Sequence, residues 1–338
     1  MTPVSSVCFL FPHLRLGGGE TAMIEAANEL KSILDVRVCA LERGGEGQPF
    51  DLRAELNRRF DDVTLIPSAG ALSHFLRSVD VLIWYGTNGW TPRALNDLPE
   101  RPKSIRIVHT DKPEEGQLFC ARWTDVIDAV VCVSPIVQRQ IPGATWIPNT
   151  ASLGRLRGTG GKPFGDSRRI TVGYLGRLLS FKNIDWMIRH LKTLDCNLLV
   201  QGLDTEQWSG AALTALAERQ GVAGQLKWIP PGSDVGTLLR SVDALMMFSR
   251  HEGFPMVVVE AGFTATPVIA TPVGALPEVF ADSILFVEWD GLVPSADSVR
   301  RCLKLANAGW GKRLQQATRE LCAPQRVAAQ YLEVINAL

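Results

Sequence analysis

Residues 249–278 read "SRHEGFPMVVVEAGFTATPVIATPVGALPE", and within them Glu252 and Glu260 flank the uncharged run "GFPMVVV". The preceding run "ALMMFS" predicts a buried strand, and Gly253 gives the following turn its freedom. Pro255 suits the first position of a helix, where its missing N–H costs nothing. Because "PVIAT" then predicts a second strand, the stretch indicates a strand–helix–strand unit of a parallel sheet.

The same alternation of apolar strands and helical segments runs through the chain. In the first half, strands are predicted at residues 6–11, 36–41, 80–86, 103–109 and 128–134, with a helix at 20–34. In the second half, strands are predicted at 170–176, 197–202 and 284–288 and at "LKWIP", "ALMMFS" and "PVIAT", with helices at 184–194, 206–220, 235–241 and 255–263. Near-continuous apolar strands are typical of parallel sheets covered by helices on both faces. The expected fold class is therefore α/β, with two doubly wound Rossmann-like domains facing across a cleft.

A glycine-rich stretch, "TASLGRLRGTGGKPFGDSRR", interrupts this alternation at residues 150–169. Its glycines, proline and basic residues are typical of a linker. The expected organisation is one domain over residues 1–150, a linker over 151–168 and a second domain over 169–323. A C-terminal helix at about 324–338 is expected to pack back on the first domain.

Composition excludes some classes of partner and location. Lys plus Arg and Asp plus Glu number 35 each, so no net charge favours nucleic acid. The 7 cysteines are scattered without a C-x-x-C pair, which indicates neither a zinc site nor a disulfide framework. Without a signal peptide or a long apolar run, the chain is expected in the cytoplasm, with peripheral contact at the inner membrane face left open.

A glycine-rich loop near the N-terminus offers an alternative reading. Gly17, Gly19 and Ala22 satisfy G-x-G-x-x-A, and Glu42 ends the next strand, which would fit an NAD-dependent oxidoreductase. In that fingerprint the first glycine ends the strand, whereas here "PHLRL" intervenes. The longer loop instead indicates a helix N-terminus that a ligand can approach closely.

Two cations and two acids in the second half favour a phosphate-containing ligand. Arg177 and Lys182 share one strand-to-helix loop and could clamp a diphosphate. The start of the helix near Met256 presents free N–H groups to an anion. Glu252 and Glu260 on either side could accept hydrogen bonds from sugar hydroxyls, so the pattern indicates a nucleotide-sugar site.

The segment "HEGFPMVVVEAG…PVIATPVGALPE" closely resembles the signature of family 4 retaining glycosyltransferases, whose E-x7-E motif matches Glu252 and Glu260. Other motifs of that family appear in its order: "GGGE", "AVVCVSPIVQRQI", "WIPNT", "GRLLSFKN" and "LLVQG". The resemblance spans nearly the whole chain, with Thr150 departing from the usual glycine. It implies the two-Rossmann-domain (GT-B) fold, with an N-terminal acceptor domain and a C-terminal donor domain.

The resemblance also implies a role for each matching position. Arg177 and Lys182 would neutralise the donor diphosphate, Glu260 would hold the ribose, and Glu252 would contact the donor sugar. His109 matches a position near the reacting sugar, so Glu252, Arg177, Lys182 and His109 form the expected catalytic group. The expected donor-binding residues are Gly18, Gly19, Arg177, Lys182, Glu252, Gly253, Phe254, Pro255, Met256, Val257 and Glu260.

The expected reaction is metal-independent transfer, with retention, from a nucleotide-diphosphate sugar to an acceptor hydroxyl. No D-x-D motif occurs, so neither a metal nor another cofactor is expected. A UDP-sugar is favoured over a GDP-sugar, and the acceptor is expected to be a glycan or lipid-linked molecule in polysaccharide or glycolipid assembly. A nucleotide-sugar epimerase of the same fold stays open as an alternative. The aromatic stretch "WYGTNGW", with Trp84, Tyr85, Asn88 and Trp90, is a candidate platform for the acceptor.

Overall fold

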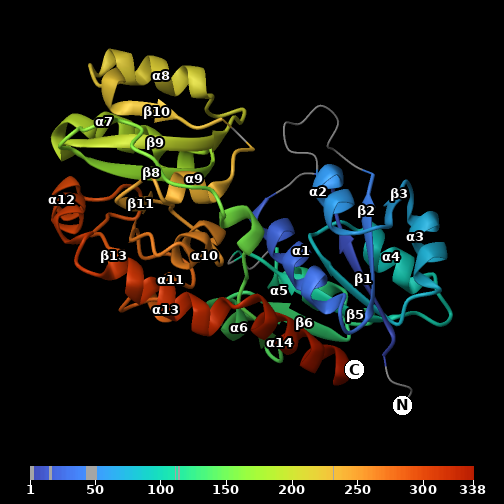
Figure 1. Ribbon diagram of the computed structural model, residues 1–338. Coiled ribbons are helices and arrows are strands. Elements are labelled where there is room, and N and C mark those ends of the chain that lie inside the picture. Colours follow the sequence, from blue (N-terminus) through green and yellow to red (C-terminus); the bar gives the residue numbers. More distant parts are fainter. Residues whose placement is uncertain (1–3, 15–16, 43–51, 111, 113–114, 231) are drawn as a thin grey trace. The chain divides into compact units, whose positions relative to one another are not determined.

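The computed structural model describes residues 4–14, 17–42, 52–110, 112, 115–230 and 232–338. Contacts divide the chain into two compact units: unit 1 holds Met1–Ala151 and Leu321–Leu338, and unit 2 holds Ser152–Glu320. Each unit contains a parallel sheet with helices packed on it (Figure 1). The expected α/β class with two doubly wound Rossmann-like domains is therefore confirmed.

Within its described residues, unit 1 has a parallel sheet in the order β3-β2-β1-β4-β5-β6-β7. The strands are β1 (Ser6–Phe11), β2 (Asp35–Leu41), β3 (Val63–Ile66), β4 (Val81–Tyr85), β5 (Lys103–Val108), β6 (Ala129–Cys132) and β7 (Thr145–Trp146). The helices are α1 (Gly18–Leu30), α2 (Leu52–Arg59), α3 (Ala69–Leu76), α4 (Trp90–Asn96), α5 (Gln117–Arg122), α6 (Pro135–Gln140) and α14 (Pro324–Asn336). All of β1 is buried, as a central strand covered on both faces must be. Helix α14 packs against α1, so both ends of the chain build this unit.

Unit 2 has a parallel sheet in the order β10-β9-β8-β11-β12-β13 among its described residues. The strands are β8 (Ile170–Arg177), β9 (Cys196–Leu203), β10 (Leu226–Trp228), β11 (Ala244–Met247), β12 (Val268–Ala270) and β13 (Leu285–Phe286). The helices are α7 (Ile184–Leu194), α8 (Gly210–Arg219), α9 (Val235–Leu239), α10 (Met256–Phe263), α11 (Leu276–Val279), α12 (Ala296–Leu305) and α13 (Trp310–Cys322), with short 3-10 turns η1 (Leu153–Leu156), η2 (Ser180–Lys182) and η3 (Ala223–Gln225). One face of the sheet packs on α7, α8 and α12 through a core that includes Trp186, Leu213 and Val299.

Both sheets reverse their strand order once, and each reversal defines a place for a ligand. In unit 1 the reversal lies between β1 and β4, and in unit 2 it lies between β8 and β11. In open parallel sheets, ligands bind beyond the carboxyl ends of the strands at this switch point. A ligand is therefore expected at the loops after β1, β4 and β5 in unit 1 and at the loops after β8 and β11 in unit 2.

The glycine-rich segment before β8 packs closely on unit 2. The N–H of Gly158 donates to Asp234 Oδ1 at 2.9 Å, and a Cβ added at Gly158 would lie 2.2 Å from Thr237 Oγ1. A Cβ at Gly160 would lie 2.2 Å from the carbonyl oxygen of Arg240. Two of its glycines are thus required by close approach to α9 and the residue after it.

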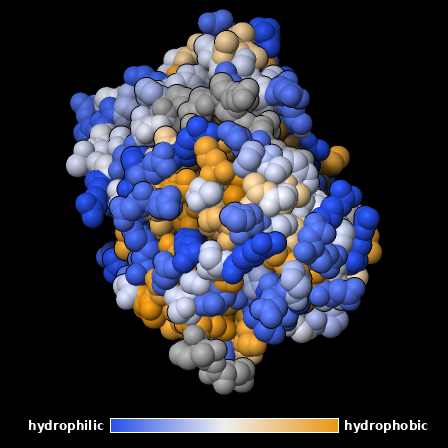
Figure 2. All heavy atoms as spheres, turned by 90° about the vertical axis from the view of Figure 1, so that its right-hand side faces the viewer, coloured by the Kyte–Doolittle hydropathy of each residue, from blue (hydrophilic) through white to orange (hydrophobic). Residues whose placement is uncertain are grey.

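The surface mixes polar and apolar side chains. Figure 2 shows one face of the molecule, where apolar side chains gather in patches between hydrophilic ones. Among the described residues, no helix combines the length and apolar character needed to cross a membrane.

Candidate active site

Two loops at the switch point of unit 2 are tied together and bring Lys182 onto Glu252. The N–H of Arg250 donates to the carbonyl of Phe181 at 2.8 Å, and the rings of Phe181 and His251 stack with centroids 4.3 Å apart. Lys182 Nζ then donates to Glu252 Oε1 at 2.7 Å. Two residues 70 positions apart in the sequence therefore form one ion pair at the predicted ligand site.

Further contacts fix this pair in place. Ser249 Oγ donates to the same Glu252 oxygen at 2.7 Å. Asn183, with a left-handed backbone (φ 54), donates its amide to the carbonyls of Phe248 and Leu292, both at 2.8 Å. The side chains of Lys182 and Glu252 are only 15% and 17% exposed. Such a half-buried, charge-assisted pair holds its geometry better than a surface pair does.

Arg177 remains available to an anion. It is exposed, and among the residues that the structure describes no carboxylate pairs with it. The hydroxyl of Tyr174 donates to its backbone carbonyl at 2.6 Å. Burial and the Glu252 charge raise the pKa of Tyr174, while Arg177 opposes this shift, so the three groups share one electrostatic environment. The loop thus presents one free cation beside one paired cation.

The start of α10 supplies backbone donors at the same edge. Pro255 is the N-cap rather than the first helical residue, so Met256 and Val257 carry the first N–H groups without a partner inside the helix. The side chain of Phe254 is buried and lies against Phe280, with ring centroids 6.0 Å apart. Only the backbone of Phe254 is therefore suited to meet a ligand.

Glu260 lies on the second turn of α10 and is buried, and its side-chain carboxyl group has no hydrogen bond to another residue within the described part of the chain. Burial raises its pKa from 4.5 to about 7, and the charge of Arg155 works against this shift. A buried carboxyl group without a partner is costly to stability, so its presence indicates a ligand that supplies donors.

A second polar cluster occupies the switch point of unit 1. His109 directly follows β5 and is half-buried, and its two ring nitrogens are shielded from solvent and have no hydrogen-bond partner among the described residues. Burial, with a smaller contribution from the Arg106 charge, lowers its pKa to about 4, so the ring is neutral at pH 7. Tyr85 meets the His109 ring edge-on at 5.3 Å between centroids. The Tyr85 hydroxyl donates to the Glu20 carboxylate on α1.

The predicted glycines border this cluster. A Cβ added at Gly19 would lie 3.3 Å from His109 Cδ2, and Gly18 beside it is exposed. The structure therefore brings Gly19 and His109 together within unit 1. It likewise brings Lys182, Glu252 and the start of α10 together within unit 2.

The proposed aromatic platform is wrong for Trp84, which lies inside the core. Trp84 is fully buried, donates its ring N–H to Ser104 at 2.8 Å and packs against the Arg106 guanidinium. The Asn88 side chain accepts the N–H groups of Trp90 and Thr91, each at 3.1 Å, and so caps α4. Trp90 packs on the core of unit 1. Core packing thus excludes Trp84, while Asn88 and Trp90 are half-buried at the start of α4 and stay predicted members with Tyr85.

The NAD interpretation has no geometric support at the glycine loop. Strand β1 ends at Phe11 and α1 begins at Gly18, so the glycines do not follow the strand directly. Glu42 follows β2, and its Oε1 lies 3.9 Å from Arg53 Nη2. The tight strand-to-helix turn of a dinucleotide fingerprint is therefore missing at this loop.

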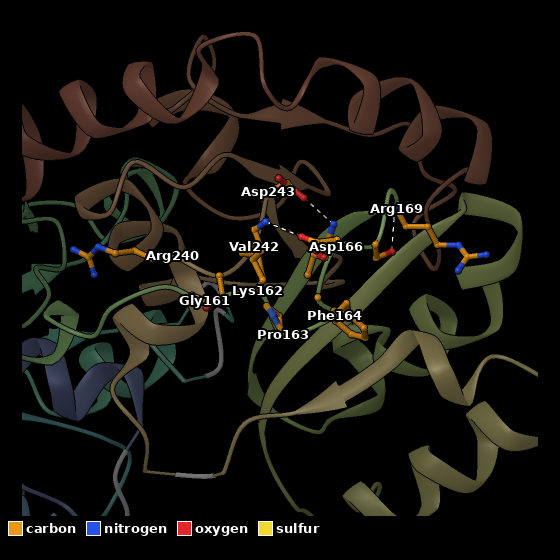
Figure 3. Close-up of a pocket in the computed structure, with 13 residues that line it drawn as sticks. Gly161, Lys162, Pro163, Phe164, Asp166, Arg169, Arg240, Val242 and Asp243 are labelled. Atoms are coloured by element: carbon orange, nitrogen blue, oxygen red, sulfur yellow. Dashed lines mark hydrogen bonds and ion pairs between the residues drawn. The ribbon is translucent and has the colours of Figure 1, made fainter.

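One surface hollow in unit 2 is separate from these sites. It has a volume of about 450 Å³ and lies at the amino end of β8, the edge of the sheet opposite to Arg177 and Lys182 (Figure 3). Its charged groups pair with protein partners: Lys162 with Asp166, Arg169 with Asp195, and Asp243 with the N–H of Thr171. We therefore assign the chemistry to the switch points. Among the described residues, no group of three or more His, Cys, Asp or Glu side chains is arranged to hold a metal ion.

Several functional residues escape the sequence patterns. Tyr174 and Ser249 support Glu252 and Arg177, and Glu20 and His13 belong to the cluster around His109. Glu20 was visible only as the last letter of "GGGE". The signal that could have found it is a lone acid in the first turn of a helix at a switch point.

The fold defines a class, the proteins with two Rossmann-like α/β domains. Residues 162–297 match the family described as Glycosyl transferases group 1. Curated relatives include the D-inositol 3-phosphate glycosyltransferase of Mycobacterium sp. (strain KMS), 33% identical over 131 residues, and that of Mycobacterium bovis (strain BCG / Pasteur 1173P2), 31% identical over 155 residues. These matches cover 37% and 43% of this chain but only 30% and 32% of the relatives' length.

Solved structures share the fold over nearly the whole chain. Anabaena Alr3699/HepE, solved in complex with UDP and glucose, superposes with a TM-score of 0.79 at 17% identity and covers 99% of this chain and 100% of that one. A glycosyltransferase from Rickettsia africae ESF-5 superposes with a TM-score of 0.77 at 17% identity, covering 99% of this chain and 98% of that one. The fold is therefore that of the GT-B glycosyltransferases.

Proposed function

We propose that the protein is a metal-independent glycosyltransferase that moves a sugar from a nucleotide-diphosphate sugar to an acceptor hydroxyl with retention of configuration. The observation that carries this proposal is the arrangement of Arg177, the Lys182–Glu252 pair and the start of α10 at one switch point. Two cations and free helical N–H groups can meet a diphosphate, and a carboxylate beside them can bind sugar hydroxyls. The family match over residues 162–297 covers this same region.

Each group has a defined task in this proposal. Arg177 and Lys182 stabilise the charge that develops on the departing diphosphate, as electrostatic catalysis requires. Glu252 accepts a hydrogen bond from the transferred sugar while it keeps Lys182 oriented. Glu260 binds the ribose hydroxyls, and the departing phosphate takes the proton of the acceptor hydroxyl. His109 contacts the transferred sugar as a neutral ring.

The source and destination of the sugar follow by analogy. UDP is the favoured nucleotide, which the solved Anabaena protein also binds. A ring polyol is a reasonable acceptor, since the curated relatives are named for D-inositol 3-phosphate. We propose a role in glycan or glycolipid assembly on the cytoplasmic side, with peripheral membrane contact.

Thermal stabilisation by UDP, GDP and ADP, measured first without metal and then with EDTA, tests the proposal. We expect one nucleotide to raise the melting temperature, EDTA to leave the shift unchanged, and Arg177→Ala to abolish it. Arg189→Ala is the matched control, since Arg189 is an exposed cation of α7 that pairs with Asp185. Absence of a shift with every nucleotide would contradict the proposal. Stoichiometric release of the nucleoside diphosphate during turnover would separate transfer from epimerisation.

A further inference from the structure

The polar cluster of unit 1 contains a buried carboxylate, Glu20, and a half-buried ring, His109, whose shielded nitrogens have no hydrogen-bond partner among the described residues. The Glu20 side chain is 8% exposed, and no lysine or arginine pairs with it in the part of the chain that the structure describes. Its neighbours are the Tyr85 hydroxyl and His13 Nε2, which lies 3.6 Å from Oε1. Within the described ranges, neither ring nitrogen of His109 has a hydrogen-bond partner. Buried polar atoms are nearly always satisfied in proteins, so the two ring nitrogens of His109 beside a carboxylate indicate a missing ligand.

The glycines of the N-terminal loop leave these two groups uncovered. A Cβ at Gly17 would lie 2.6 Å from Glu20 Oε2, and one at Gly19 would lie 3.3 Å from His109 Cδ2. Neither glycine has a left-handed backbone, so conformational freedom is not the reason for them. A side chain at Gly17 would fill the space next to the carboxylate, and one at Gly19 would fill the space next to the imidazole.

The chemistry of the cluster selects a neutral, hydroxylated ligand. A carboxylate accepts hydrogen bonds only, and a neutral imidazole offers one donor and one acceptor. A diphosphate would be repelled by Glu20, whereas a ring with neighbouring hydroxyls can donate to Glu20 and both donate to and accept from His109. Tyr85 uses its hydroxyl to orient the carboxylate, and its ring edge supports the imidazole.

We propose that Glu20, oriented by the Tyr85 hydroxyl, binds the ring hydroxyls of a sugar or cyclitol that lies against His109. The inference rests on the proposed sugar transfer for the source of that ring, which is either the donor sugar or the acceptor. Glu20 is thereby a substrate-contacting residue, and Tyr85 is a positioning residue.

The test uses the full chain and two readouts. The first is the imidazole ¹⁵N spectrum of the protein, with the His109 signals assigned by a His109→Gln variant, during addition of UDP, UDP-glucose, UDP-galactose, glucose and myo-inositol. The second is the affinity of each UDP-sugar relative to UDP, measured by calorimetry. The variants are Glu20→Gln and Tyr85→Phe, with Glu29→Gln, a half-buried acid of the same helix, as matched control.

We expect sugar-bearing or cyclitol ligands, but not UDP alone, to shift the His109 signals. Glu20→Gln should weaken the contribution of the ring to binding about tenfold, the size expected for a lost charged hydrogen bond. Tyr85→Phe should weaken it less, and neither variant should change UDP affinity. A response to UDP-sugars identifies the donor as the source, and a response to free glucose or inositol in the presence of UDP identifies the acceptor.

Two results would overturn the inference. One is a wild-type His109 signal that no sugar, cyclitol or UDP-sugar moves. The other is unchanged ring binding in both Glu20→Gln and Tyr85→Phe, and the second variant decides the matter if the first does not fold. UDP binding that depends on Arg177 would survive either result, so failure here is distinguishable from failure of the proposed function.

Discussion

Glu260 shows at the scale of one residue how a binding group can cost stability. The folded protein holds its pKa at about 7, above the ordinary value of 4.5, because burial disfavours the charged form. Between these two values the folded state binds more protons than the unfolded state does. Stability therefore falls as pH rises through this window, the reverse of the usual behaviour of a paired carboxylate.

The variant Glu260→Gln should lack this pH dependence of stability. Relative to this variant, the wild type should lose up to about 3 kcal/mol of unfolding free energy between pH 4.5 and pH 7.5, since each pKa unit corresponds to about 1.4 kcal/mol. Urea unfolding of both proteins at several pH values measures the difference. A difference that does not depend on pH would show that Glu260 is not buried as a neutral acid.

The same substitution should weaken nucleotide binding. In the proposed site the ionised carboxylate accepts hydrogen bonds from both ribose hydroxyls, and its loss is expected to reduce affinity about 10- to 100-fold. Binding to the wild type should weaken as pH falls below about 7, and this pH dependence should vanish in Glu260→Gln. Calorimetric titration with UDP at pH 6 and pH 8 checks both statements. Equal affinity in the two proteins would remove Glu260 from the ribose site.

At the scale of elements, the turn that carries Glu252 is held by the segment before α11. Gly274 has a left-handed backbone (φ +57), and a Cβ there would lie 2.1 Å from the carbonyl oxygen of Glu252. The N–H of Ala275 donates to the carbonyl of Gly253 at 3.0 Å. The "PVGALPE" segment is thus a support for the "HEG" turn, which explains why the two occur in one stretch.

Gly274→Ala should therefore disturb both stability and binding. The backbone strain costs about 1 kcal/mol, and displacement of the Glu252 carbonyl should raise the total to about 2–4 kcal/mol. Gly291→Ala is the matched control, because Gly291 also has a positive φ (+92) but nothing lies within 4 Å of an added Cβ. Chemical unfolding and UDP titration of both variants measure the effects. Equal losses in the two variants would contradict the support role.

Sequence patterns predict these elements unevenly, for physical reasons. Strand β1 and helix α7 have the predicted bounds, because a buried parallel strand and an amphipathic helix leave clear periodicities. Strand β3 has four residues and β7 only two, too few for a pattern. The contact of Lys182 with Glu252 can be predicted only when the strand order is known, because 70 residues separate the two side chains in the sequence. The fold class predicts where the switch point lies, but the structure is needed to show which side chains meet there.

At the scale of the whole molecule, unit 1 is completed by the last residues of the chain. The buried side chains of α14 include Val327, Tyr331, Val334 and Ile335. Thr150, at the end of the first part of unit 1, donates its hydroxyl to the carbonyl of Cys322 at 2.7 Å. From the sequence we expect a C-terminal helix at about 324–338 that packs back on the first domain, and in the structure α14 contacts α1.

A chain that ends at Cys322 should consequently lose stability in unit 1 while unit 2 stays folded. Four buried apolar side chains at about 1.5–3 kcal/mol each give an upper estimate of about 6–12 kcal/mol for the loss, comparable to the whole stability of a domain. Calorimetry should show one transition displaced to low temperature and another that UDP still stabilises, because the proposed diphosphate site lies in unit 2. Removal of Ala337 and Leu338 alone, which follow the last helical residue, is the control and should change little. Loss of both transitions together would mean that the units unfold as one cooperative body.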